Sequence, residues 1–330
     1  MRIAVTGSIA TDHLMFFPGR FTEQFVSDRL DRVSLSFLVD DLMIRRGGVA
    51  ANIAFGLGVL GLRPVLVGAV GSDFDDYRTW LERHGVDTGS VHVSRTRHTA
   101  RFLCTTDQDQ NQIASFYAGA MVEARDIALR PVAERVGGLD LVVVAPNDPE
   151  AMLRHTAECR AQGYRFAADP SQQLARMSGT EITELVDGAH LLFTNEYESA
   201  LLLEKTGWSH ADVLARVGSW VTTLGDKGVR IESAHAPAVE VPAAPEQRRV
   251  DPTGVGDAFR AGFLAALAWG LGTERAAQVG CQLAVLVLET AGTQEYVLHR
   301  ADFLDRLRRA YGAEVAEEVA EHLVPARSGP

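Results

Sequence analysis

Short apolar runs and longer periodic stretches follow one another along most of the chain. A short apolar run between turn residues predicts a buried strand, and a longer stretch with a helical period predicts a helix. From about residue 141 the two alternate regularly, as in a parallel sheet whose strands are joined by crossover helices. Two long helices are expected to follow, over Gly256–Trp269 and Thr273–Glu289. The strands expected in this half are Leu141–Ala145, Phe166–Ala168, Leu191–Thr194 and Trp220–Leu224.

The first half shows the same rhythm with strands added to it. The regular elements expected are strands Ile3–Thr6 and Pro64–Val70 and helices Val49–Val59 and Asp73–His84. Residues Val33–Val39 alternate like a half-buried strand, and Thr99–Thr106 with Gln112–Phe116 flank a polar turn like a hairpin. The α/β rhythm does not need these extra strands. We therefore expect one α/β domain over 1–330, with a small β lid inserted at about 13–45 and 93–118 and a flexible tail at 324–330.

Composition narrows the class of protein. The 330 residues are 46% hydrophobic and 23% charged, which is ordinary for a soluble globular protein. A net charge of −11 argues against nucleic acid or a membrane surface as the main partner, but it leaves room for a small phosphorylated ligand. Three widely separated cysteines, Cys104, Cys159 and Cys281, and an N-terminus that begins as a strand predict a cytoplasmic protein. The run Leu283–Leu288 is too short to span a bilayer.

The segment Asp251–Asp257 carries the strongest chemical signal. It joins a glycine-rich turn to an apolar helical stretch, and such a turn leaves backbone N–H groups free to bind an anion. Asp257 would repel that anion, so its place is explained if it takes a proton from a group that attacks the anion. The segment therefore predicts phosphoryl transfer to a hydroxyl. The plainer interpretation is a loop in which Asp257 or Thr253 caps the helix.

Polar and glycine-rich segments also follow other predicted strands. Gly7–Asp12 follows the first strand, and Gly47-Gly48 precedes the helix that carries Asn52. Thr222–Gly228 and Asn195–Glu198 follow two later strands. Ligands of open α/β sheets bind at this edge. Each segment alone has a plainer interpretation, as an Asx turn, a tight turn or a hairpin.

Several common enzyme classes are excluded by their motifs. Gly56–Gly61 fits the dinucleotide pattern G-x-G-x-x-G, but it ends a helix instead of following a strand, so it is interpreted as a helix terminus. The chain has no P-loop motif, no His-Glu-x-x-His and no Gly-x-Ser-x-Gly. P-loop kinases, zinc proteases and serine hydrolases are therefore not expected.

Taken together, the motifs resemble those of the ribokinase-like (PfkB-type) carbohydrate kinases, in order along nearly the whole chain. Asp251–Asp257 resembles the second family signature, with Pro252 and Val255 in place of the commoner Thr and Ala, and Arg46–Ala54 resembles the first. The resemblance implies an α/β, three-layer fold with a mostly parallel central sheet, and an ATP-dependent kinase that uses Mg²⁺. It implies that Asp257 is the catalytic base and that three residues offer amides to the transferred phosphate: Gly254, Val255 and Gly256.

The resemblance also implies ligand contacts. Asp12 and Asn52, with Ser8 and Gly48, are expected at the sugar, and Glu198 is expected to position Mg²⁺ through water. K⁺ activation, common in the family, would use oxygens of Asp251, Thr253, Val287 and Gly292. The residues expected at the nucleotide are Asn195, Thr223, Leu224, Gly225, Asp226, Lys227, Gly228 and Gly256.

For the acceptor, four segments look most like bacterial adenosine kinases of this family. These segments are Val5–Leu14, Val33–Asp41, Ala168–Arg176 and Asp251–Arg260. A purine needs a flat apolar surface, which Phe102, Phe116 and Phe37 can offer, although packing within the lid explains any one of them. Further contacts implied are Gln172 and Gln173 at the ribose or base, Arg176 at phosphate, and Ser36 from the lid of a partner subunit.

The expected reaction is therefore ATP-dependent phosphorylation of the 5′-hydroxyl of adenosine to give AMP, by a homodimer paired through its lids. A ribose- or fructose-type sugar kinase of the same family remains an alternative. A nucleoside-binding protein without turnover is the alternative from another class.

Overall fold

A nine-stranded sheet forms the centre of the computed structural model, which describes residues 1–25 and 35–323. The strand order is β13-β12-β11-β10-β9-β8-β1-β4-β5. Neighbouring strands from β11 across to β5 are parallel, and β12 and β13 add an antiparallel edge. The strands are β1 (Ile3–Thr6), β4 (Val65–Val70), β5 (Asp87–Val93), β8 (Leu141–Val144), β9 (Phe166–Ala168), β10 (Leu191–Asn195), β11 (Ser219–Thr223), β12 (Val229–Ser233) and β13 (Ala236–Val241).

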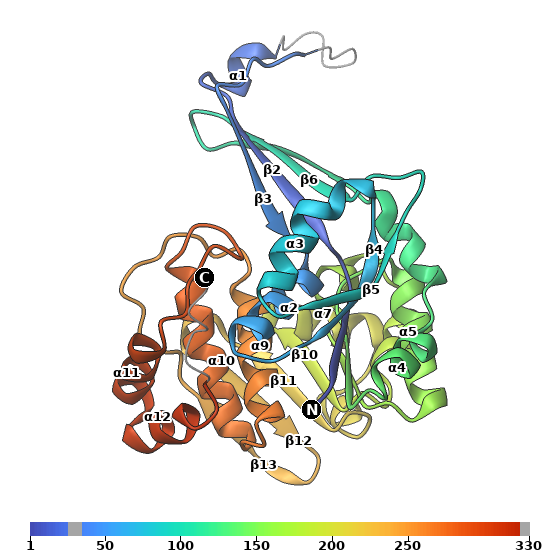
Figure 1. Cartoon of the computed structure of the whole chain (residues 1–330), viewed down its shortest axis with the longest axis vertical. Coiled ribbons are helices and arrows are strands. Elements are labelled where there is room, and N and C mark those ends of the chain that lie inside the picture. The colour runs from blue at the N-terminus through green and yellow to red at the C-terminus, as the bar shows by residue number, and fades with distance from the viewer. Residues whose placement is uncertain (26–34, 324–330) are drawn as a thin grey trace.

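Helices cover both faces of this sheet, so the molecule has three layers (Figure 1). Alternate residues of the buried strands enter two separate cores: Ile3 and Val5 pack on one face and Ala4 on the other. The first core includes α2 (Val49–Val59), α3 (Asp75–Arg83), α9 (Val255–Ala268), α10 (Thr273–Leu288), α11 (Arg300–Tyr311) and α12 (Ala313–Ala320). The second includes α4 (Leu129–Val136), α5 (Pro149–Gln162), α6 (Gly179–Val186), α7 (Glu196–Thr206) and α8 (His210–Leu214).

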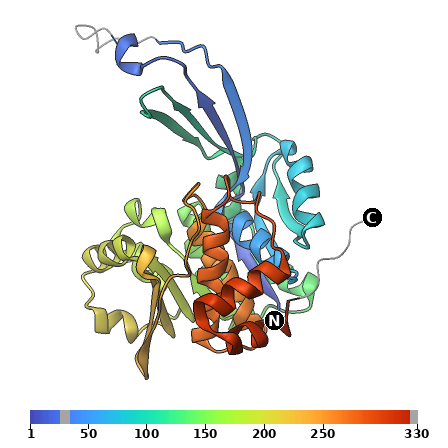
Figure 2. The same ribbon diagram turned by 90° about the vertical axis from the view of Figure 1, so that its left-hand side faces the viewer.

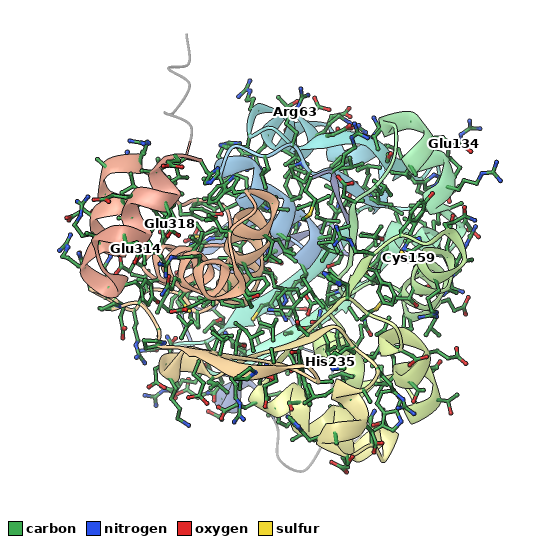
Figure 3. The ribbon with its side chains drawn as sticks, turned by 90° about the horizontal axis from the view of Figure 1, so that it is seen from below. Arg63, Glu134, Cys159, His235, Glu314 and Glu318 are labelled. Atoms are coloured by element: carbon green, nitrogen blue, oxygen red, sulfur yellow. The ribbon has the colours of Figure 1, made fainter. Side chains whose placement is uncertain are left out.

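The outer helices carry charge at the periphery. Seen from below, Glu134 of α4 lies on the opposite side of the molecule from Glu314 and Glu318 of α12 (Figure 3). Among the residues that the structure describes, none of the helices combines the length and the apolar character needed to cross a bilayer. The remaining short helical segments are α1 (Phe21–Gln24), η2 (Ser72–Phe74), η3 (Gly119–Asp126), η4 (Ser171–Ala175) and η5 (Gly225–Lys227).

A second, four-stranded sheet projects from the main body, and we call it the lid (Figures 1 and 2). Its order is β3-β2-β6-β7, with β2 and β6 parallel and the outer pairs antiparallel. Each strand contributes six or seven residues, and the hairpin expected around the polar turn is β6–β7. The strands are β2 (Ala10–Phe16), β3 (Asp41–Gly47), β6 (Ala100–Thr106) and β7 (Gln112–Tyr117).

The prediction of a lid strand at Val33–Val39 is wrong for those of its residues that the structure describes. Residues 33 and 34, like the tail 324–330, lie outside the described residues, and residues 35–39 form no strand. The strand is instead β3, which pairs residue by residue with β2 from Asp41–Phe16 to Gly47–Ala10. Pairing to β2, not local alternation, decides where the strand lies. Asp12 is accordingly part of a strand and not of a turn after β1.

The main-body elements that the sequence analysis predicted agree closely with the structure, whereas β5, β13, α11 and α12 were not predicted. Helix α2 and strand β9 begin and end at the predicted residues, α9 differs from its prediction by one residue at each end, and α10 differs by one residue at its C-terminal end. Gly56–Gly61 forms the end of α2 and the following turn, as expected. The fold class predicted from the sequence, a mostly parallel sheet between helices plus a smaller sheet, is confirmed.

Candidate active site

Many of the predicted residues gather at the carboxyl edge of the parallel strands. Ser8 follows β1, Asn195 ends β10 and Thr223 ends β11. Asn195 and Thr223 are register partners on neighbouring strands, so the two segments expected at the nucleotide lie side by side. The chain turns at Gly225–Lys227 into antiparallel β12, so Thr222–Gly228 is also a hairpin connection. Gly228 is buried, whereas Gly225, Asp226 and Lys227 are exposed.

The start of α9 presents free amides as the sequence suggested. Gly254 is the N-cap, with φ of +79°, and a Cβ there would lie 2.8 Å from Cγ2 of Thr293. Glycine is therefore required by both conformation and space. The amide of Val255 donates a long hydrogen bond of 3.4 Å to the carbonyl of Pro252, whereas the amides of Gly256 and Asp257 have no acceptor one turn back within the helix. They form a positive N-terminus suited to an anion.

Asp257 lies in this first turn and faces Asn52 of α2. Nδ2 of Asn52 donates a hydrogen bond of 2.8 Å to Oδ2 of Asp257. The side chain keeps partial solvent contact, but its surroundings are mostly protein, and burial raises the pKa of Asp257 to about 7. The Asn52 hydrogen bond and the charge of Arg260 oppose this rise. A carboxyl group that titrates near neutrality is suited to general base catalysis.

Asn52 is held by residues from the other end of the chain. Its Oδ1 accepts hydrogen bonds from Oγ1 of Thr293 at 3.0 Å and from Nε2 of Gln294 at 2.9 Å. Nε2 of Gln294 also lies 2.6 Å from Oη of Tyr77, which donates to the carbonyl of Gly47. These supporting residues were missed in the sequence analysis because they lie outside the motifs. Asn52 thus directs one N–H to Asp257, in addition to the expected sugar contact.

Ser8 and Gly48 fix the start of α2. Oγ of Ser8 accepts a 3.0 Å hydrogen bond from the amide of Val49. Gly48 has φ of +93°, and a Cβ there would lie 2.6 Å from the carbonyl oxygen of Ser8. Close backbone approach at this glycine therefore sets the position of Asn52 one turn later.

Asp12 and the lid phenylalanines share one face of the lid sheet. Asp12 is the register partner of Phe102, and Phe102 is the partner of Phe116. Directly opposed residues point to the same side of a sheet. Burial, with a contribution from the negative charge of Glu295, raises the pKa of Asp12 to about 6. We call this side, which also carries Arg45, the inner face of the lid.

The residues expected at K⁺ are only partly suited to a second cation. Asp251 accepts hydrogen bonds from the amides of Thr253 at 2.9 Å and Gly292 at 3.0 Å. Nη1 of Arg45 lies 3.5 Å from the same carboxylate. The carbonyl of Val287 accepts a hydrogen bond from Thr290. Because Arg45 already brings a positive charge to Asp251, this set fits K⁺ poorly.

Asn195 and Glu198 cap α7 reciprocally. The Asn195 side chain accepts from the Glu198 amide, and the Glu198 carboxylate accepts from the Asn195 amide, each at 2.8 Å. Oγ of Ser171 donates to the other Glu198 oxygen at 3.3 Å. Across residues 1–25 and 35–323, no group of three or more acidic, histidine or cysteine side chains is arranged to bind a metal directly. Glu198 therefore fits Mg²⁺ only as an ion carried by ATP and contacted through water.

Buried polar atoms near this edge lack partners. Gln173 uses Nε2 to donate to the carbonyl of Asn147 at 2.8 Å, but its Oε1 has no partner, and neither has Nδ2 of Asn147. Both side chains are buried. Such atoms are rare in folded proteins, and a polar ligand would satisfy them. Asn147 was not among the predicted residues, whereas the predicted Gln172 and Arg176 are exposed.

Two cavities differ in how near they lie to the predicted site residues. One, of about 370 Å³, lies between the lid and the loop before α9. Its lining includes Leu14, Phe16, Met43, Arg45, Val250 and Asp251. The other, of about 350 Å³, lies near the amino ends of β9 and β10, away from the predicted residues. The lid cavity adjoins the Asp251 loop and is the one related to the site.

Comparison with known proteins agrees with this geometry. Residues 6–300 match the pfkB family of carbohydrate kinases. The chain belongs to this family. It is 31% identical over 253 residues to a nucleoside kinase of Methanocaldococcus jannaschii, covering 75% of this chain and 80% of that protein. It is 32% identical over 271 residues to a nucleoside kinase of Methanothermobacter thermautotrophicus, covering 81% and 86%.

A solved structure extends the similarity to the whole fold. The nucleoside kinase of Burkholderia thailandensis in complex with inosine superposes with a TM-score of 0.81 at 32% identity. The alignment covers 94% of this chain and 98% of that one. This pfkB-family chain is thus an ATP-dependent kinase with the ribokinase-like fold.

Proposed function

We propose that this kinase transfers the γ-phosphoryl group of ATP to the 5′-hydroxyl of a nucleoside, with adenosine as substrate and AMP as product. The observation that carries the proposal is Asp257 in the first turn of α9, beside free amides and hydrogen-bonded to Asn52. A base and an anion site in one helical turn suit attack of a hydroxyl on a phosphoryl group.

In the proposed reaction, the 5′-oxygen forms a bond to the γ-phosphorus while the bond from that phosphorus to the bridging oxygen of ADP breaks. The hydroxyl proton passes to Asp257, and ADP leaves with the bridging electron pair. The amides of Gly254, Val255 and Gly256 are assigned to the transferred phosphoryl group. ATP, with its Mg²⁺, is assigned to Asn195 and Thr223–Gly228, and Glu198 to a water of the metal. Positioning and charge neutralisation supply most of the catalysis.

A nucleoside acceptor is supported by the relatives and by the lid. The three proteins compared are described as nucleoside kinases, one of them with inosine. Asp12 and Asn52 are assigned to the ribose, with Ser8 and Gly48 beside them. Phe102 and Phe116 form a cross-strand aromatic pair on the same face as Asp12, suited to a base. Gln172 and Gln173 are assigned to the ribose or base of the same ligand, and Arg176 to phosphate charge.

A substrate panel tests the proposal. Release of ADP from ATP is measured with adenosine, guanosine, inosine, ribose and fructose, each at several concentrations. Highest kcat/KM with adenosine is expected. Preference for ribose or fructose would favour the sugar-kinase alternative, and nucleoside binding without ADP release would favour the binding protein. Asp257→Asn is the control for enzyme-dependent turnover.

We also propose that two copies pair through their lids. The outer face of the lid, opposite Asp12, exposes apolar side chains of β3 and β7, with Ile44 59% and Leu42 53% exposed. Ile113 and Tyr117 of β7 share that face and are exposed. Such a surface suits burial against another copy. In this arrangement Ser36, which is exposed, is assigned to the partner's ligand.

Light scattering at micromolar concentration tests the pairing. A dimer is expected for the natural chain, and Ile44→Glu is expected to weaken it. A natural chain that scatters as a monomer would contradict the pairing without affecting the proposed reaction.

A further inference from the structure

A buried ion pair joins β9 to α9 behind the proposed base. Asp169, directly after β9, is 0% exposed, and Arg260 of α9 is 6% exposed. Nη2 of Arg260 donates to Oδ1 of Asp169 at 2.7 Å. Nε lies 2.5 Å from Oδ2, but without the alignment of a hydrogen bond, so we count that approach as a charge contact. The two residues are 91 positions apart, and no motif of the sequence connects them.

Arg260 is held on two further sides. Its Nη1 donates to the carbonyl of Gly256 at 3.0 Å, and its guanidinium lies 5.5 Å from the ring centroid of Phe193 on β10. Gly256 and Asp257 both belong to the first turn of α9. Arg260 therefore connects the end of β9 directly to the turn that carries the proposed base and anion-binding amides.

The pair also shapes the charge around Asp257. The ionisable groups that face Asp257 are Arg260 on its own helix, Asp169 after β9, Glu198 on α7 and Tyr296 after α10. Of these, only Arg260 is positive. Its charge lowers the pKa of Asp257, whereas the charges of Asp169 and Glu198 raise it. Asp169 thus limits how strongly Arg260 acts on the base.

Stability alone is a weak reason for such a pair. Desolvation of two buried charges cancels much of their attraction, and apolar side chains of similar volume often stabilise a protein as well or better. A role in positioning the first turn of α9 explains why the charges of Asp169 and Arg260 lie behind it.

We propose that Asp169 and Arg260 are positioning residues for phosphoryl transfer. Through Gly256 the pair holds the first turn of α9 against the end of β9, and Asp169 keeps the Arg260 charge from pairing with Asp257. The inference rests on the proposed function, because it takes Asp257 as the base.

The test compares Asp169→Asn, the double variant Asp169→Asn/Arg260→Met, and a matched control. The control, Arg306→Met, breaks another largely buried pair, Arg306–Glu289 at 2.7 Å, on α11 and outside the site. For each protein, kcat/KM for adenosine is measured from pH 5.5 to 9.5, together with the melting temperature. The acid limb of this profile reports the base of the free enzyme.

The acid limb is expected to move in opposite directions in Asp169→Asn and in the double variant. Asp169→Asn leaves Arg260 without its counter-charge, so the limb should move down by about one pH unit, and the rate on the plateau above the limb should fall by up to about tenfold, because the base is weaker. Adding Arg260→Met removes the freed charge and should move the limb back up. Turnover should stay low, because the contact with Gly256 is lost. Arg306→Met should lower the melting temperature and leave the limb in place.

An unmoved acid limb in Asp169→Asn would overturn the proposal, whatever the loss of activity. If Asp169→Asn does not fold, Arg260→Lys answers the same question. It keeps the charge and loses the fork geometry, so the limb should stay and turnover should fall; unchanged turnover contradicts the positioning role. Asp257→Asn, measured alongside, distinguishes failure of the base assignment from failure of the positioning role. If it retains turnover, the base assignment fails; if it is inactive while the Asp169→Asn limb is unmoved, only the positioning role fails.

Discussion

Replacement of Asn52 by alanine should move the pH dependence of the enzyme. Asn52 donates a 2.8 Å hydrogen bond to Asp257 and so stabilises the ionised form of that carboxyl. Hydrogen bonds to charged groups are worth about 1.5–3 kcal/mol. At about 1.4 kcal/mol for each pKa unit, their loss raises the pKa of Asp257 by about 1–2 units. The direction follows because the hydrogen bond lowers the pKa in the natural chain.

The effect on rate follows from the ionised fraction. With a pKa of about 7, half of Asp257 is ionised at pH 7. After a rise of about 1–2 units, roughly 1–10% is ionised, so kcat/KM at pH 7 should fall by about 5- to 50-fold from ionisation alone. Most of this part of the loss should be recovered near pH 9. Any lost contact between Asn52 and the nucleoside lowers kcat/KM equally at every pH.

The assay is initial-rate ADP release with adenosine from pH 5.5 to 9.5 at constant ionic strength and saturating MgATP. Thr156→Val is a suitable control, because it removes a buried hydroxyl on the other face of the sheet. Its acid limb should match that of the natural chain. A uniform loss in Asn52→Ala, with the limb unmoved, would refute the reasoning, since Asn52 would then act on binding only.

Four further predictions use other parts of the molecule. Asp257→Asn should lower kcat by about 10²–10⁴ with a smaller effect on KM, and steady-state rates check this. Gly254→Ala should lower both the melting temperature and kcat, because φ of +79° costs about 1–2 kcal/mol for a residue with a Cβ and because Thr293 occupies the space. Rates in K⁺ and in tetramethylammonium should be similar, and a K⁺ requirement should appear in Arg45→Met; a strong K⁺ requirement in the natural chain would contradict the role given to Arg45. Hydrogen bonds from Thr99 and Arg101 lower the pKa of Asp73 to about 2, so their stabilisation is present above pH 4 and is lost as the pH falls toward 2. Thermal melts should therefore show a weaker acid dependence in Asp73→Asn than in the natural chain.

The main body could be predicted from the sequence because local signals there agree with the final packing. Helix α2 begins after Gly48, whose positive φ requires glycine, and it is marked by a mostly apolar stretch that is buried from Ala50 to Leu57. The inner strands β1, β4 and β8 are buried on both faces, so they appear as continuous apolar runs. The edge strand β5 is polar and partly exposed, and the sequence analysis did not predict it.

The lid could not be predicted with the same accuracy. The apolar residues Leu42, Met43 and Ile44 of β3 are consecutive and all exposed, so they show no inside–outside alternation. Residues 35–39 alternate but have no partner strand. A strand with no buried face is placed by its pairing, which is a long-range property.

Within the site, motifs identified the residues at strand and helix ends but not those that support them. Asp257, Asn52 and Gly254 stand out because their spacing around glycines is unusual. Arg260 resembles any polar residue in an apolar helix until β9 is placed beside it. Gln294 lies 242 positions from Asn52. Contacts of this kind depend on topology, and no local pattern contains them.

The position of β1 has a consequence for synthesis on the ribosome. Its two neighbours are β4 and β8, and about 70 residues separate the end of β4 from the start of β8. At roughly 5–20 residues per second, this delay lasts about 4–14 s. During that time one edge of β1 presents unpaired N–H and C=O groups, which can pair with another chain. A strand that is fully buried in the finished protein is therefore open to aggregation while the protein is being made.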